Sequence, residues 1–212
     1  MSHGIQDVLS RSELIYSRLE IEQAIELMAE KIRRDFHNQC PVFLTLMNGG
    51  MFFGAKLGLE LGIDAEFDYV HATRYHGETT GSGLAWLRRP TAVIEGRPVL
   101  LVYDILDEGH TLKAVRDWCE DQGATRVKIA AMTVKRHARC VPGLEADYVG
   151  LMVPDRYVFG YGMDVNEHGR NLPSVVGVRD RRAHRAHLLL HQLAELRQRG
   201  VGHCGANERI GA

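Results

Sequence analysis

Apolar residues form short runs along most of the chain, and amphipathic stretches separate them. The continuous apolar run 99–102 is typical of a strand that is buried on both faces of a sheet, and the mostly apolar run 42–47 is also expected to be a buried strand. Strands that alternate with helices predict an α/β domain with a mainly parallel sheet. The expected strands cover residues 42–47, 65–75, 84–87, 99–102, 128–134, 148–153 and 174–178.

Helix boundaries are marked by capping and stop signals. Ser17 and Glu20 form a capping-box pattern that opens a helix. A second helix is expected over 51–61, where Gly62 stops it, and a third over 111–121, which ends at Gly123. The apolar stripe of the first helix is expected to contain Leu19, Ala24, Ile25, Met28 and Ile32.

Composition is that of an ordinary globular protein. The 212 residues fit one domain with a small appendage, and a net charge of -1 gives no electrostatic support for nucleic acid as a partner. The four cysteines contain no CxxC pair, so we expect reduced thiols rather than a zinc site or a disulfide framework. No signal peptide and no apolar run long enough to span a bilayer are visible, so a cytoplasmic location and no membrane partner are expected.

The stretch 99–112 carries the clearest chemical signal. A buried strand is expected to end at the acids Asp104 and Asp107, and Gly109 and the start of a helix at Thr111 follow. Ligands bind beyond the carboxyl ends of strands in open α/β sheets, and the first N–H groups of a helix form an anion site. A helix cap alone would also explain an Asp at this place. Neither a GxxxxGK[ST] nor a GxGxxG motif is present, which argues against an NTPase or a dinucleotide-binding protein.

This stretch resembles the phosphoribosyl pyrophosphate signature of type I phosphoribosyltransferases. The resemblance implies that fold: a mainly parallel central sheet flanked by helices, with a small hood. Two positions depart from the signature, because Tyr103 replaces the first acid and Glu108 replaces Thr or Ser. The residues implied to bind the donor are Asp104, Asp107, Glu108, Gly109, His110 and Thr111.

Further motifs resemble the hypoxanthine-guanine branch of that family. Residues 46–50 are similar to its pyrophosphate loop, which implies a cis peptide bond between Met47 and Asn48. Asn48, Gly49 and Arg170 are thereby implied to bind pyrophosphate. Arg74 and Tyr75, which lead into the polar loop 76–83, resemble the start of the family's flexible lid.

The base-binding residues are also implied by the resemblance. Lys135 would donate to the carbonyl oxygen of a 6-oxopurine, since an ammonium group is only a donor. Tyr157 would stack on the purine ring, and Val158 would offer backbone groups to its far edge. Asp164 completes the implied purine site, and Asp104 and Asp164 would hold Mg²⁺. Without the neighbouring motifs, Lys135 would be interpreted as a solvent-exposed lysine and Tyr157 as a core aromatic residue, rather than as base-binding residues.

The implied activity is Mg²⁺-dependent transfer of a phosphoribosyl group from phosphoribosyl pyrophosphate to hypoxanthine or guanine. Asp107 is the candidate base for the purine N7 proton, and it could equally stay ionised and stabilise a ribose cation. A regulatory protein that senses the donor or a nucleotide is the alternative from another class. A pyrimidine or xanthine transferase is a third interpretation. A homodimer or homotetramer is expected.

Two regions are expected along the chain. Residues 1–180 would form the catalytic domain, with a hood built from terminal segments, and 181–212 a basic C-terminal helical extension. The extension is expected to pack on the domain or on another subunit. Binding of a metal, of nucleic acid or of a membrane surface by the extension is a weaker alternative. Its apolar stripe comprises Leu189, Leu190, Leu193 and Leu196, and its histidines are His184, His187 and His191.

Overall fold

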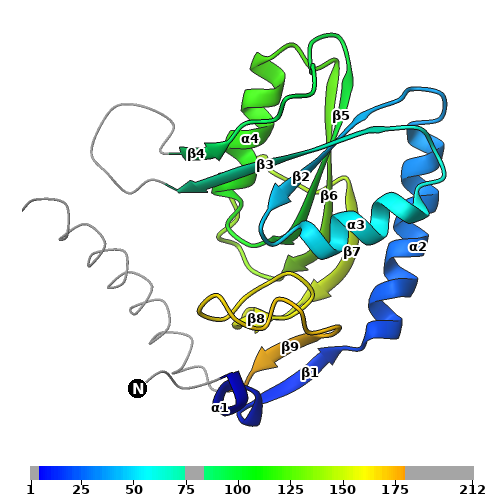
Figure 1. Cartoon of the computed structure of the whole chain (residues 1–212). Helices are drawn as coiled ribbons and strands as arrows, with labels where there is room; N and C mark the ends of the chain where they lie inside the picture. Colours follow the sequence, from blue (N-terminus) through cyan, green and yellow to red (C-terminus); the bar gives the residue numbers. More distant parts are fainter. Residues whose placement is uncertain (1–4, 75–83, 180–212) are drawn as a thin grey trace, which may run out of the picture.

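A computed structural model describes residues 5–74 and 84–179 of the chain. Within these ranges, four helices and nine strands build two sheets (Figure 1). The N-terminal elements are α1 (Ile5–Ser10), β1 (Ser12–Tyr16), α2 (Arg18–Asp35), β2 (Val42–Met47), α3 (Met51–Glu60), β3 (Glu66–Arg74) and β4 (Leu84–Arg88). They are followed by β5 (Pro98–Leu106), α4 (His110–Asp121), β6 (Arg126–Lys135), β7 (Tyr148–Val153), β8 (Val158–Phe159) and β9 (Val175–Val178).

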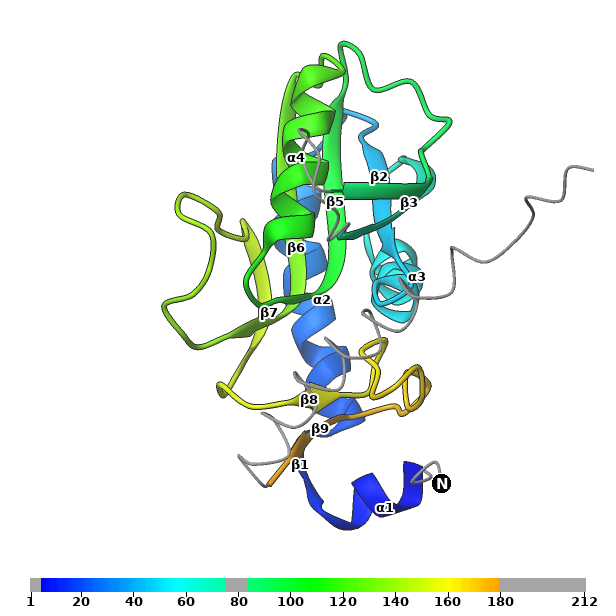
Figure 2. The same cartoon turned by 90° about the vertical axis from the view of Figure 1, so that its left-hand side faces the viewer.

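The larger sheet has six strands in the order β4-β3-β2-β5-β6-β7. Its pairings are parallel except for that of β4, which is antiparallel to β3. This arrangement confirms the mainly parallel α/β sheet that the sequence predicts. Helices α2 and α3 lie on one face of the sheet and α4 on the other (Figures 1 and 2).

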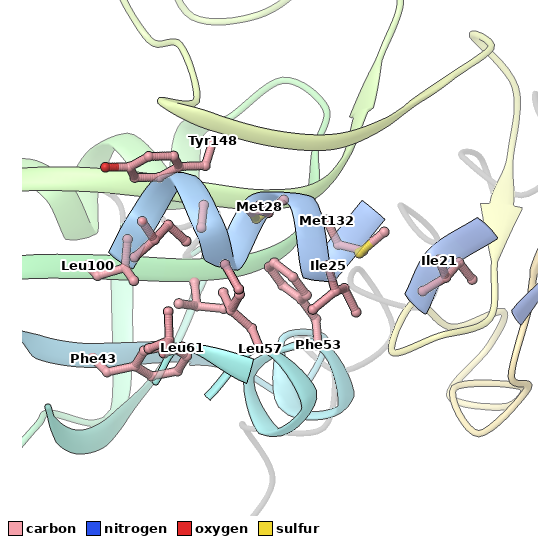
Figure 3. Close-up of a cluster of buried hydrophobic side chains, with 14 of the residues drawn as sticks. Ile21, Ile25, Met28, Phe43, Phe53, Leu57, Leu61, Leu100, Met132 and Tyr148 are labelled. Atoms are coloured by element: carbon pink, nitrogen blue, oxygen red, sulfur yellow. The ribbon is translucent and has the colours of Figure 1, made fainter. Parts of the chain in front are cut away.

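Successive side chains of β5 point to opposite faces of the sheet and contribute to two hydrophobic cores. Leu100 and Val102 pack under α2 and α3, whereas Val99 and Leu101 pack under α4. All four side chains are fully buried, which explains why this strand reads as a continuous apolar run. Figure 3 shows the first core, in which the side chains of α2 and α3 meet those of β2, β5, β6 and β7.

A second, smaller sheet lies beyond the carboxyl ends of the parallel strands (Figure 1). Its antiparallel order is β1-β9-β8, so the N-terminal strand pairs with the last described one. Phe159, Val165, Val176 and Val178 form its buried cluster. The position of this sheet places the segment 157–172 opposite the loops that follow β2, β5 and β6 (Figures 1 and 2).

Helix α2 confirms the predicted capping box, in which the Ser17 side chain accepts from the Glu20 backbone and the Glu20 side chain accepts from the Ser17 N–H. The predicted stripe is partly wrong, because Leu19 is 64% exposed and Ile21 is fully buried. Ile21, Ile25 and Met28 share one face of the helix at spacings of four and three residues, and Leu19 lies off that face.

Strand β5 is longer than the prediction of 99–102, since it continues through Asp104 to Leu106. The loop 76–83 and the C-terminal extension 181–212, with its leucine stripe and three histidines, lie outside the described residues. Within the described ranges, no helix combines the length and apolarity that crossing a bilayer requires.

Candidate active site

The loop after β2 contacts the acid in β5. The peptide bond between Met47 and Asn48 is cis, which confirms the prediction for this loop. A Cβ atom on Gly49 would lie 1.9 Å from Oδ2 of Asp104. A side chain at this position would therefore have to displace the Asp104 carboxyl group, because the Gly49 backbone lies directly against it.

Asp104 is a buried carboxyl group with an incomplete set of partners. It is 5% exposed, and its Oδ1 atom has no hydrogen-bond partner among the residues that the structure describes. Burial raises its pKa to about 6, although backbone N–H groups and Arg170 act in the opposite direction. Buried polar atoms are normally satisfied, so a carboxyl group left in this state indicates a site for a ligand or an ion.

The register between β5 and β6 brings a second acid against a lysine. Leu106 pairs with Val134, so Asp107 and Lys135 become neighbours at the ends of the two strands. The Lys135 ammonium group donates to Oδ2 of Asp107, and the Lys135 side chain is only 6% exposed. Nε2 of His137 lies 2.5 Å from Oδ1 of the same carboxylate. Burial alone would raise the pKa of Asp107, but the bonds to Lys135 and His137 outweigh it and hold that pKa below its ordinary value.

Helix α4 begins directly after these residues. Gly109 is its N-cap and has φ +81°, a left-handed conformation that glycine adopts without strain. A Cβ atom there would also lie 2.3 Å from Cδ2 of Leu144. Glu108 and His110 on either side are exposed and lie 3.7 Å apart, measured from Oε2 to Nε2. The N–H groups of this first turn, including that of Thr111, have no acceptor within the helix, and helix N-termini of this kind are suited to binding anions.

A third group comes from the segment after β8. Nη2 of Arg170 lies 2.8 Å from Oδ1 of Asp164, and Nη1 of Arg170 donates to the carbonyl oxygen of Gly162 at 2.9 Å. A Cβ atom on Gly162 would lie 2.0 Å from the carbonyl oxygen of Gly49. Close backbone contact therefore joins the segment with Arg170 and Asp164 to the loop beside Asp104.

Tyr157 and Val158 lie at the edge of the small sheet. The Tyr157 hydroxyl donates to the backbone oxygen of Asp164 at 2.6 Å, and its ring packs against the cluster around Phe159. Val158 is buried and pairs with Gly177 of β9. The described contacts thus fix Tyr157 through its hydroxyl and tie it to Asp164.

The predicted residues fall into two connected sets. One joins Asp104, Gly49, Asp164 and Arg170, and the other joins Asp107 to Lys135. Tyr103, the departure from the donor signature, packs against the core under α4, and burial raises the pKa of its hydroxyl, so this side chain stays neutral. Arg74 ends β3, and Tyr75 lies outside the described residues.

The sequence prediction did not include His137. It follows Lys135 by two residues, just beyond the end of β6, and its side chain is 4% exposed. The only available signal was a histidine close to a predicted base-binding lysine, which does not by itself indicate a contact with Asp107.

Known proteins resemble this chain over most of its length. The model of the phosphoribosyl transferase domain matches residues 12–168. A hypoxanthine-guanine phosphoribosyltransferase of Streptococcus pneumoniae is 35% identical over 164 residues, which cover 77% of this chain and 91% of that protein.

Solved structures give the same result. A hypoxanthine-guanine phosphoribosyltransferase of Bacillus anthracis superposes with a TM-score of 0.72 at 28% identity, covering 78% of this chain and 97% of that one. A hypoxanthine-guanine-xanthine phosphoribosyltransferase has a TM-score of 0.71 at 27% identity, with coverages of 78% and 95%. The chain therefore belongs to the phosphoribosyl transferase domain family.

Proposed function

We propose that this protein transfers the phosphoribosyl group of phosphoribosyl pyrophosphate to hypoxanthine or guanine, which gives IMP or GMP and pyrophosphate. The observation that carries the proposal is the Asp107–Lys135 pair beside the N-terminus of α4. A carboxylate for the purine proton and an ammonium group for the purine carbonyl oxygen thus lie next to a helix N-terminus, which is suited to binding the phosphate of the donor. The names of the relatives in Streptococcus pneumoniae and Bacillus anthracis support the same activity.

Each part of the donor has a matching group in this proposal. The 5-phosphate binds the N–H groups of residues 108–111 at the start of α4. The ribose hydroxyls lie against Asp104, and the pyrophosphate lies between the Asn48–Gly49 backbone and Arg170. Tyr103 supplies no carboxylate, so Asp104 binds the ribose without the second acid of the usual signature.

The base is recognised through Lys135, Tyr157 and Val158. Lys135 donates to the O6 atom of hypoxanthine or guanine, whereas adenine has a donor at that position and is rejected. The bond from C1′ of the ribose to the pyrophosphate oxygen breaks, and its electron pair leaves with pyrophosphate. A nitrogen lone pair of the purine forms the new bond to C1′, and Asp107 accepts the proton that the purine N7 loses.

The donor set also fits Mg²⁺. The unpartnered Oδ1 atom of Asp104 and the nearby carboxylate of Asp164 are oxygen ligands, the type that this ion prefers. Within residues 5–74 and 84–179, no group of three or more His, Cys, Asp or Glu side chains is arranged to hold a metal. Mg²⁺ keeps several waters and substrate oxygens, so one or two carboxylates suffice. Asp104 and Asp164 would hold the ion, which would supply positive charge to offset the negative charge on the departing pyrophosphate.

The experiment is an assay of nucleotide formation. The full-length protein is incubated with Mg²⁺, the donor and, separately, hypoxanthine, guanine, xanthine, adenine or uracil, and products are separated by chromatography. We expect IMP and GMP, no AMP, and no product when a chelator removes Mg²⁺. Donor binding without turnover of any base would instead identify a sensor and contradict the proposal. A cytoplasmic location and homo-oligomerisation stay predictions from the sequence.

A further inference from the structure

His137 is a buried titratable side chain that the proposed reaction does not yet use. Its ring is 4% exposed, and its Nε2 atom lies 2.5 Å from Oδ1 of Asp107. Lys135 occupies the other oxygen, Oδ2, of the same carboxylate. The two oxygens of Asp107 therefore have different partners, one from the end of β6 and one from the loop that follows it.

The second ring nitrogen fixes the tautomer of His137. Its Nδ1 atom accepts a hydrogen bond from the backbone N–H of Arg139 at 3.0 Å. A neutral imidazole carries its proton on one nitrogen only, so the proton must lie on Nε2 when Nδ1 accepts. In the neutral ring, Nε2 is consequently the donor and Oδ1 of Asp107 is the acceptor.

The loop that sets this tautomer is itself tied to the segment that precedes Tyr157. Nη2 and Nη1 of Arg139 lie 2.6 and 2.9 Å from the two carboxylate oxygens of Asp155. Such a two-point pair restricts the orientation of both groups. The chain of contacts runs from Asp155 through Arg139 to His137 and ends at Asp107.

We propose that His137 is a positioning residue, which holds Oδ1 of Asp107 so that Oδ2 faces the purine proton. This proposal rests on the proposed function, because it assigns a role in the same proton transfer. In the proposed complex, the ammonium group of Lys135 is shared between Oδ2 of Asp107 and the purine O6. His137 has no such second task and keeps the carboxylate oriented at that moment.

Two substitutions separate the two hydrogen bonds of the ring. His137→Gln places an amide nitrogen near the position of Nε2, so it can still donate to Asp107. His137→Asn places an amide oxygen near the position of Nδ1, so it can still accept from the Arg139 N–H but cannot reach Asp107. Thermal unfolding of both variants controls for loss of the folded state.

We expect His137→Gln to keep a kcat close to that of the wild type. His137→Asn should lower kcat by about 10- to 100-fold, because misplacement of a reacting group by about 1 Å has a cost of this order. KM for the donor should change little in either variant, since neither bond touches the donor site. If the Asn variant keeps kcat, or both variants lose it equally, the ring serves only the loop and the proposal is wrong.

A second measurement does not depend on activity. The ¹⁵N resonances of the His137 ring in the full-length protein should report a proton on Nε2, and Asp107→Asn should shift them. A proton on Nδ1, or no response to Asp107→Asn, would overturn the contact on which the proposal depends. A wild-type protein that forms no nucleotide while these resonances behave as expected would contradict the proposed function and leave the hydrogen bond established.

Discussion

Asp104→Asn should stabilise the ligand-free protein while weakening donor binding. The carboxyl group is buried, one of its oxygens has no partner among the described residues, and its pKa is raised from 3.8 to about 6. A tenfold change in proton affinity is worth about 1.4 kcal/mol, so this difference corresponds to a penalty of about 3 kcal/mol for the ionised form. The amide has nearly the same shape and carries no charge to bury.

The sign of the pH dependence follows from linkage. The folded protein binds the Asp104 proton more tightly than the unfolded chain, so the wild type loses stability as pH rises through this window. Below about pH 4 both states are protonated and the penalty is absent, whereas above about pH 6 it is present in full. The stability difference between Asp104→Asn and the wild type should therefore grow by about 2–3 kcal/mol between pH 4 and pH 7.

Urea unfolding of both proteins at several pH values measures this difference. Asp155→Asn is a matched control, because the ion pair with Arg139 lowers the pKa of Asp155 to about 2. That variant should be less stable than the wild type at neutral pH, and its deficit should shrink in acid. A stability difference for Asp104→Asn that stays constant between pH 4 and pH 7 would refute the reasoning.

Two other substitutions test the loop and the helix cap. Gly49→Ala should reduce donor affinity and destabilise the protein by about 1–3 kcal/mol, because the added Cβ would overlap Oδ2 of Asp104. Calorimetric titration measures the donor affinity, and thermal unfolding measures the stability. Ser17→Ala removes one half of the capping box of α2 and should lower the free energy of unfolding by about 1 kcal/mol without changing kcat; equal stability would show that the cap contributes nothing.

The central strands of the parallel sheet could be predicted from the sequence because they are buried on both faces, as in β2, which coincides with residues 42–47. The edge strand β7 coincides with the predicted 148–153 because its residues are mostly apolar, although its middle residues are only partly buried or exposed. In β1, by contrast, Ser12 is the only buried residue, so no buried apolar run marks that strand. Helix α1 has no buried residue, and β8 has only two residues, which leaves no periodicity to detect.

The candidate site was predictable as a set of residues but not as a set of contacts. The motifs indicate Asp107 and Lys135, yet their pairing depends on the register of Leu106 with Val134, which no local pattern encodes. The sequence predicts that the strand ends before Asp104, because the apolar run ends at Val102. In the structure the strand continues through Tyr103. The Tyr103 side chain packs against the core under α4, and its backbone pairs with Ala131 of β6. The contact of His137 with Asp107 likewise arises from the fold of the loop after β6.

The most direct test of the account is the turnover of Asp107→Asn compared with its affinity for the donor. If Asp107 accepts the purine proton, kcat should fall by at least about 100-fold, because the amide cannot act as a base. Equilibrium binding of phosphoribosyl pyrophosphate should stay close to that of the wild type, since the anion site consists of backbone N–H groups. A kcat near the wild-type value with either base would contradict the central claim.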